Sequence, residues 1–181
     1  GASGGSGANR GVQVVSSGGS ASVSSAGGGV MLTGTGTGAA GNFNIGVLLN
    51  GPVSDAAGGN VTIIGSGGPG AGGDNYGIWV NTAAASVSST MGSVSLSGTG
   101  GGAGNANHGV LLNLGGASAP GAGTLTVTGI AGAGTSDDFN FAGAATLNSG
   151  TGGALTMNAD TINLDSAMEV KGAGALIIQP S

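Results

Sequence analysis

Seven acidic side chains are the residues of this sequence that could carry out chemistry on a substrate. They are Asp55, Asp74, Asp137, Asp138, Asp160, Asp165 and Glu169. Enzymes that cleave polysaccharides need carboxyl groups that converge on one bond as acid and as base or nucleophile. Asp137 and Asp138 are the best pair, but neighbours on a strand point to opposite sides. Asp55 and Asp74 have no acidic partner at the same phase of a neighbouring repeat, so no catalytic residue and no enzyme are predicted.

The remaining candidate ligands are too few for a metal site. His108 is the single histidine, there is no cysteine, and no Ser-His-Asp arrangement has a supporting motif. The segment 72–75, Gly-Gly-Asp-Asn, resembles one calcium-binding nonapeptide repeat but lacks the tandem copies that share ions. We therefore predict no metal and no cofactor, and we expect His108 to be a side chain at the edge of a loop.

The composition excludes several classes of protein. Of 181 residues, 45 are Gly and only 5% are charged, far from ordinary globular usage. Disorder requires low hydrophobicity, whereas the mean hydropathy here is +0.33, and Gly does not recur at every third position as in collagen. The net charge of −5, with Arg10 and Lys171 as the two basic residues, argues against nucleic-acid binding. No apolar run reaches the roughly 18 to 20 residues of a membrane span, so no membrane insertion is predicted.

One pentapeptide recurs along the chain and reveals a repeat. Gly-Val-Leu-Leu-Asn at 46–50 returns as Gly-Ile-Trp-Val-Asn at 77–81 and as Gly-Val-Leu-Leu-Asn at 109–113, with a fainter copy at 11–15. The β-branched residues that follow the glycines are 35, 31 and 32 residues apart. They are Val12, Val47, Ile78 and Val110.

A second motif has the same period and alternates apolar and polar residues. Its leading residues are Val30, Val61, Val94, Leu125 and Leu155. Alternation with a period of two is typical of a strand with one buried face. A weaker third strand is predicted around 22–24, 52–54, 86–88 and 118–119. The core strand positions that these motifs predict are Val47, Ile78, Val110, Val61, Val94, Leu125, Leu155 and Leu176.

Three short strands in each repeat predict one coil of a triangular solenoid. Equivalent strands pair in parallel one coil apart, and such crossovers are right-handed. We predict an all-β, right-handed parallel β-helix (β-solenoid) of about six coils, forming a single domain over 1–181. Coils of about 32 residues run to about 154, and a shorter coil of about 21 residues occupies 155–178. The extra residues form Gly-rich loops along one edge, at 33–43, 65–73 and 99–106.

Asparagines recur at two phases of the repeat and predict structural ladders, because stacked amides can bond along a solenoid axis. The first column is Asn9, Asn44, Asn75, Asn107 and Asn140, and the second is Asn50, Asn81, Asn113 and Asn148. The position after the first column has no common chemistry, which predicts that it is exposed. It is occupied by Arg10, Ile45, Tyr76, His108 and Phe141.

These motifs are similar to those of known surface proteins. The Gly-Val-x-Leu-x-Asn repeats with Gly-rich loops resemble the very large β-strand-repeat surface proteins of bacteria. The closing segments 155–164 and 172–180 resemble coils of filamentous-haemagglutinin-like secreted adhesins. The resemblance covers nearly the whole chain, implies a secreted or surface-attached β-helix, and carries over no catalytic or binding residue.

The function expected from the sequence is structural. We expect a non-catalytic extracellular protein of the bacterial cell surface, an adhesin stalk or a filament-forming β-helix. Expected partners are further copies stacked end to end, or neighbouring coils of a longer chain, since the chain opens on Gly1 like a processed segment. The alternative is a solenoid that binds a surface glycan, or ice, through its Thr/Ser face or its Gly-rich loops. A polysaccharide-degrading enzyme is the third class.

Overall fold

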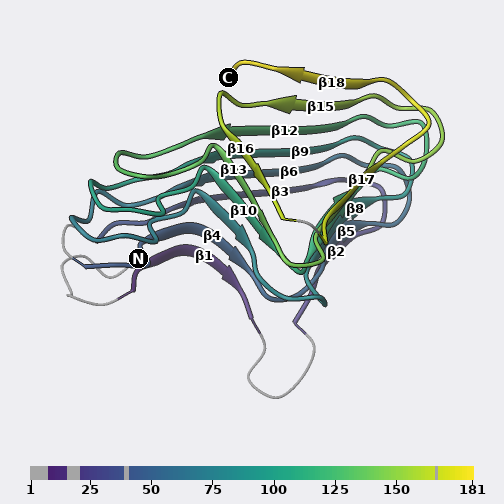
Figure 1. Ribbon diagram of the computed structural model, residues 1–181. Coiled ribbons are helices and arrows are strands. Elements are labelled where there is room, and N and C mark those ends of the chain that lie inside the picture. The colour runs from purple at the N-terminus through teal and green to yellow at the C-terminus, as the bar shows by residue number, and fades with distance from the viewer. Residues whose placement is uncertain (1–7, 16–20, 39–40, 166) are drawn as a thin grey trace.

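The computed structural model describes residues 8–15, 21–38, 41–165 and 167–181. In these residues every regular element is a strand, and the strands form three parallel sheets of six strands each. Each strand pairs with those three places before and after it in the chain, so successive coils lie on top of one another (Figure 1). The predicted all-β parallel solenoid with three strands in each coil is confirmed. The described residues contain no helix that is long and apolar enough to cross a membrane.

We name the sheets A, B and C in the order in which each coil visits them. Sheet A contains β1 (Arg10–Val14), β4 (Ile45–Leu49), β7 (Ile78–Val80), β10 (Val110–Asn113), β13 (Phe139–Ala142) and β16 (Ile162–Leu164). Sheet B contains β2 (Val23–Ser25), β5 (Val53–Asp55), β8 (Ser86–Ser89), β11 (Gly116–Ser118), β14 (Thr146–Asn148) and β17 (Glu169–Lys171). Sheet C contains β3 (Val30–Thr35), β6 (Val61–Ser66), β9 (Val94–Thr99), β12 (Leu125–Ile130), β15 (Leu155–Asn158) and β18 (Leu176–Gln179).

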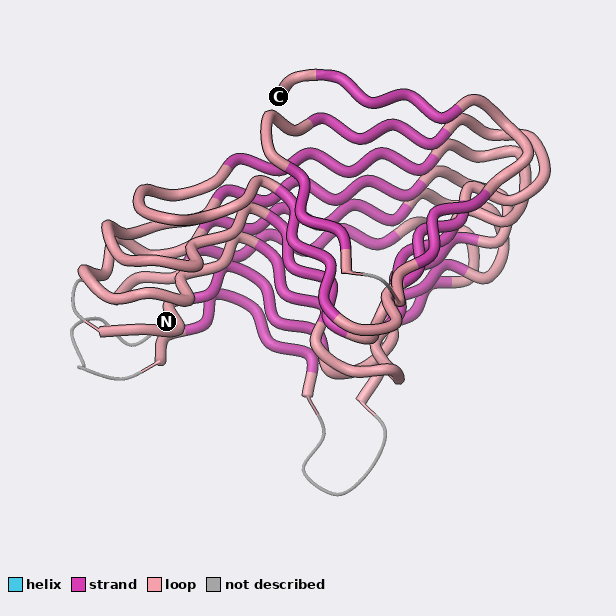
Figure 2. The backbone as a smooth tube through the Cα atoms, in the orientation of Figure 1, coloured by secondary structure: helices cyan, strands magenta, loops and turns pink. Residues whose placement is uncertain are grey.

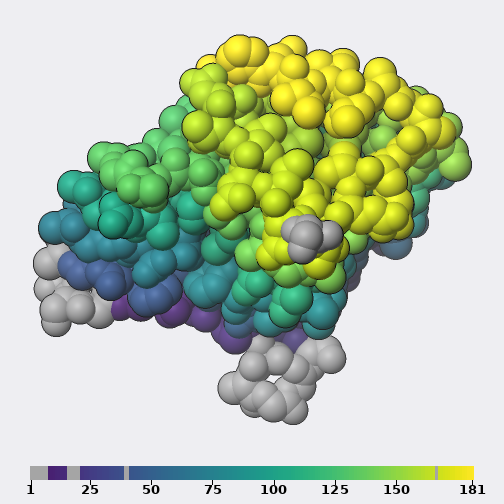
Figure 3. Space-filling model, in the orientation of Figure 1, coloured from purple at the N-terminus to yellow at the C-terminus, as the bar shows by residue number. Residues whose placement is uncertain are grey.

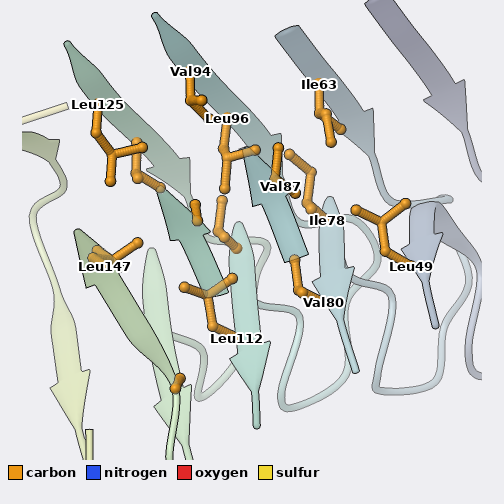
Figure 4. Packing of buried hydrophobic residues seen from close by; sticks show 14 of the residues in the cluster. Leu49, Ile63, Ile78, Val80, Val87, Val94, Leu96, Leu112, Leu125 and Leu147 are labelled. Atoms are coloured by element: carbon orange, nitrogen blue, oxygen red, sulfur yellow. The ribbon is translucent and has the colours of Figure 1, made fainter. Parts of the chain in front are cut away.

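The core is built from columns of apolar side chains that run along the solenoid axis. Alternation within each strand places every second residue inside, as the burial of Val61, Ile63 and Gly65 in β6 illustrates. The registers then stack equivalent residues, so that Val61 lies between Val30 and Val94. Figure 4 shows Leu and Val side chains of all three sheets converging on one interior space. Each added coil therefore buries its apolar face against the previous one.

Glycines mark the corner where sheets C and A approach most closely. A Cβ atom on Gly65 of β6 would lie 2.1 Å from the carbonyl oxygen of Gly77, and one on Gly98 of β9 would lie 2.1 Å from that of Gly109. Conversely, a Cβ atom on Gly46 would lie 2.3 Å from the backbone nitrogen of Ser66. The recurring glycine of the pentapeptide therefore serves close backbone approach rather than a left-handed turn.

The Gly-rich loops connect sheet C to the next strand of sheet A and project from one side of the solenoid (Figure 2). They begin one to three residues later than predicted, because β3, β6 and β9 continue to Thr35, Ser66 and Thr99. Successive loops are bonded through their backbones, as the N–H of Asp74 donates to the carbonyl of Asn105 at 3.2 Å and that of Ala103 to the carbonyl of Gly70 at 3.3 Å. The loops are thus a continuation of the stacked architecture.

Two details of the predicted strand pattern are wrong. The fourth member of the third strand is β11, which places Ala117 rather than Ala119 in register with Val87. In addition, fewer residues separate Val110 from its register partner Phe139 than the average repeat contains. From Phe139 onward, each residue of the fifth coil therefore stands earlier in the sequence than the average repeat predicts. Residues assigned to that coil by the average period therefore occupy other columns.

Candidate functional site: polar ladders, buried carboxylates and an aromatic patch

The first asparagine ladder fills the interior of the loop region. Asn9 donates its Nδ2 to Oδ1 of Asn44 at 3.0 Å, Asn44 donates to Asn75 at 2.8 Å, and Asn75 donates to Asn107 at 3.1 Å. The side chains of Asn44, Asn75 and Asn107 are fully buried. Because their remaining donors bond loop carbonyls such as that of Gly72, no amide capacity faces solvent for a ligand.

The predicted fifth member of this ladder is wrong. Asn140 lies within β13 and pairs with Leu111, because of the short step into the fifth coil. Ser136 takes its place, and its hydroxyl accepts the backbone N–H of Asn107 at 2.8 Å. A hydroxyl at this phase has no counterpart in the earlier repeats, so the sequence pattern could not identify it.

Asn75→Ala is expected to lower the free energy of unfolding by about 3 kcal/mol. The substitution removes the shared acceptor of the backbone N–H and one Nδ2 hydrogen of Asn44, and leaves both hydrogens buried without a partner, while Nδ2 keeps its second bond to the carbonyl of Gly41. Asn113→Ala is the matched control, since Asn113 is half-buried and makes one side-chain bond to Asn81 at 3.3 Å. Its loss should be below about 1 kcal/mol in urea denaturation followed by circular dichroism. Equal losses in the two variants would contradict this assignment.

The second ladder is shorter and lies at the end of the sheet A strands. Asn113 donates to Asn81 at 3.3 Å, and Asn81 donates to Asn50 at 3.1 Å. The register partner of Asn113 in the next coil is Ala142, so the ladder does not continue there. Asn148, its predicted fourth member, lies instead in sheet B, where it pairs with Ser118.

The predicted core positions occupy the interior columns, with one difference. Seven of the eight are almost completely buried, namely Val47, Ile78, Val110, Val61, Val94, Leu125 and Leu155. Leu176 stands over Leu155 in the same column but is 56% exposed. It belongs to the last coil, and no described residue covers it.

Asp55 is the most deeply buried carboxylate and ties two coils together. Its Oδ2 accepts the N–H groups of Gly27 and Gly29 in the first coil, at 2.9 and 3.1 Å. Its Oδ1 accepts those of Ala57 and Gly59 in the second coil, at 3.0 and 2.7 Å. Burial alone would raise its pKa, but the four N–H donors outweigh burial and hold the pKa well below its usual 3.8. The sequence feature that could have identified this role is the position of Asp55 just before a Gly-rich turn.

Asp55→Asn is expected to reduce stability at pH 7, because an amide presents one acceptor oxygen where the carboxylate presents two. The pKa of Asp55 is lower in the folded than in the unfolded chain, so its contribution is complete above about pH 4 and is lost as pH falls below 3.8. The gap in urea midpoint between wild type and variant should therefore narrow from pH 5 to pH 2. Other titrating groups contribute equally to both proteins, and a constant gap would contradict the prediction.

The structure separates the two adjacent carboxylates that formed the best catalytic pair. Asp138 is buried and accepts the backbone N–H groups of Ala131, Asp160 and Thr161, which tie the fifth coil to the sixth. Asp137 instead accepts Nδ2 of Asn140 at 2.9 Å. The two side chains thus serve different contacts and do not converge on a common point.

The other acidic residues also lie apart from one another. Asp165 accepts the N–H groups of Gly143 and Ala167. Glu169 forms an exposed ion pair with Lys171 at 2.7 Å. The described residues contain no group of three His, Cys, Asp or Glu side chains that could hold a metal ion. At the segment that resembles a calcium repeat, Asp74 accepts the hydroxyl of Tyr76 at 2.6 Å.

An aromatic patch on the outer face of sheet A is the feature that the sequence reading missed. We define the patch as Phe43, Tyr76, Trp79 and His108. Tyr76 stacks on His108 with ring centroids 5.7 Å apart, and Phe43 stacks on Trp79 at 6.4 Å. The edge of Tyr76 meets Trp79 at 5.2 Å, so the rings form one continuous cluster over adjacent coils.

The prediction that the column containing Tyr76 is exposed is therefore wrong. Ile45 and Tyr76 are buried in a second apolar cluster, separate from the interior core, and His108 is buried with its ring stacked on Tyr76. Leu111 lies in that outer cluster as well. Phe141 belongs to the interior core, again because of the short step into the fifth coil.

His108 is held as a neutral ring, and its geometry does not fit a catalytic dyad. Burial lowers the pKa of His108, against the opposing effect of Asp137. Its Nδ1 accepts the backbone N–H of Asp137 at 3.0 Å, so it cannot donate a proton to the carboxylate of that residue. Burial and the hydrogen bond to Asp74 also raise the pKa of Tyr76, which keeps its hydroxyl a neutral donor.

The fold and these contacts define a class, a three-sided parallel β-solenoid bound together by axial polar ladders. Comparison with protein-family models, curated proteins and solved structures finds no match to this chain.

Proposed function

We propose that this chain is a non-catalytic structural solenoid, the rigid part of an extracellular bacterial surface protein such as an adhesin stalk or a filament. The observation that supports the proposal most is axial bonding without interruption. Three sheets continue through six coils, and the ladder from Asn9 to Ser136 crosses five of them. Such a stack forms a stiff element whose length grows with coil number. The likeness to bacterial surface repeats supports the extracellular location.

Antibodies against the purified chain test this proposal on cells that express the natural gene. We expect them to label intact cells and structures on the cell surface. Labelling that appears only after the cells are permeabilised would overturn the extracellular role. An intracellular marker protein, which should stay unlabelled on intact cells, is the control.

A non-catalytic role is supported by the contacts of the carboxylates. Asp55 and Asp138 are occupied by backbone N–H groups, and the Asp137 carboxylate faces a neutral imidazole. We expect no release of reducing ends or unsaturated products from a panel of polysaccharides. An activity that Asp137→Asn abolishes would overturn this part of the proposal.

Glycan binding is a second candidate function, and the aromatic patch favours it. Tyr76 and His108 are buried, so the rings that offer apolar contact to a sugar are the exposed Phe43 and the half-buried Trp79. Binding on a glycan array that Trp79→Ala removes, and Thr126→Ala on sheet C leaves intact, would establish this function. Ice binding has less support, because the outward residues on sheet C mix Thr, Ser and apolar side chains.

A further inference from the structure

The first and last coils of the described chain each leave three strands with an unpaired edge. These strands are β1, β2 and β3 at one face and β16, β17 and β18 at the other. At the last coil, Leu164, Leu176 and Ile178 belong to interior columns and are nevertheless exposed. Figure 3 shows this coil, in yellow, covering one end of the molecule. Strand edges and apolar columns of this kind are templates for further pairing.

We infer that a second copy of this chain covers the last coil, with its first coil stacked in the register that the six coils already share. The contacts would be β16 with β1, β17 with β2, and β18 with β3 of the next copy. The inference rests on the proposed structural function and adds the partner and its register. In this register, Leu176 meets Val30 and Ile178 meets Leu32, which continues the interior columns of sheet C.

The outward column of sheet C provides the first argument for this partner. Its four middle members are hydroxyl residues, Thr62, Ser95, Thr126 and Thr156. Its two end members are apolar and exposed, Met31 at 67% and Ile177 at 39%. Stacking in register brings Ile177 of one copy beside Met31 of the next, so the two apolar exceptions in the column cover each other.

A second outward column of sheet C, polar at every member except Ile64, provides the second argument. Gln179 donates to Asn158 at 2.9 Å, and Asn158 donates to Thr128 at 2.9 Å. The first-coil member of this column is Thr33. In the stacked register, Gln179 would face Thr33, an amide against a hydroxyl, which repeats the pairing of Asn158 with Thr128.

Charge complementarity at the corner of sheet A provides the third argument. Arg10 lies two residues before Val12, and Asp160 lies two residues before Ile162, which occupies the same column as Val12. Stacking in register therefore places Asp160 of one copy against Arg10 of the next. The Nε of Arg10 is buried without a hydrogen-bond partner among the described residues, and Asp160 is exposed. Opposite charges at opposite faces favour head-to-tail contact over contact between like faces.

Sedimentation velocity across a concentration series tests the inference on the full 181-residue chain. Wild type should form a ladder of oligomers that grows with concentration. Met31→Lys and Ile177→Lys should each weaken association about tenfold or more. Both side chains point to solvent, so neither change should disturb the fold, which thermal unfolding verifies. Thr126→Lys, in the same column but mid-solenoid, is the control and should assemble like wild type.

A mixing experiment identifies the geometry of the contact. The Met31→Lys variant keeps a last coil that can still bind, and the Ile177→Lys variant keeps a first coil that can still bind. An equimolar mixture should therefore form dimers, with one copy of each variant, and nothing larger. Combining Met31→Lys with Ile177→Glu in one chain should restore long oligomers through a new ion pair. A monomeric wild type, or a Met31→Lys variant that dimerises alone, would overturn the inference.

The stacking inference and the proposed extracellular function can fail independently of each other. A chain that labels at the cell surface yet stays monomeric refutes the stacking contact alone. A chain that assembles in this register but is found only inside the cell refutes the extracellular role alone.

Discussion

Val61→Asp is expected to unfold the coils around β6, with a loss of about 4 kcal/mol or more in the free energy of unfolding. Val61 is fully buried in an interior column between Val30 and Val94. A carboxylate at this place would have only apolar neighbours in its column and would have to be desolvated or protonated. Circular dichroism during urea denaturation would measure the loss.

Thr62→Asp is the matched control, because Thr62 is the next residue of the same strand and faces outward. Its neighbours in the column are Met31 and Ser95, so the new charge would meet no like charge there. We expect a change of less than about 1 kcal/mol. Comparable destabilisation by the two variants would contradict the assignment of inner and outer faces.

Gly98→Ala is expected to cost about 3 kcal/mol or more, the upper end of what overpacking costs. The added methyl would lie 2.1 Å from the carbonyl oxygen of Gly109 and 2.8 Å from its carbonyl carbon. These are backbone atoms held by strand pairing, so the contact cannot be relieved by a side-chain rotation. Sheets A and C would have to separate at their shared corner, which should also weaken the neighbouring coils.

Gly152→Ala provides the control for this prediction. A Cβ atom on Gly152 would meet nothing within 4 Å, so the change should fall within about 0.5 kcal/mol of wild type. Both substitutions make the same chemical change. A Gly98→Ala protein that keeps the wild-type unfolding midpoint would contradict the close approach of the two sheets.

The architecture of this protein follows from the repeat pattern in its sequence. Apolar alternation within strands and a repeat near 32 residues leave few solutions other than coils stacked in parallel. The step from Leu155 to Leu176 set the size of the shortest coil, and these residues are register partners in the structure. The columns that contain Asn44 and Asn50 could be found because identical residues recur at one phase.

The roles of residues at irregular positions of the repeat depend on their neighbours in the folded chain. The short step before Phe139 moved Asn140 out of the ladder and Asp137 against His108, and an average period cannot show such a shift. The carboxylate of Asp55 acquired its role from N–H groups in two coils that are distant in sequence. Tyr76, with no chemical likeness to Ile45 or His108, was buried because stacking covers each side chain with its neighbours. Periodicity specifies which residues stack, whereas burial and hydrogen bonding depend on what lies beside them in space.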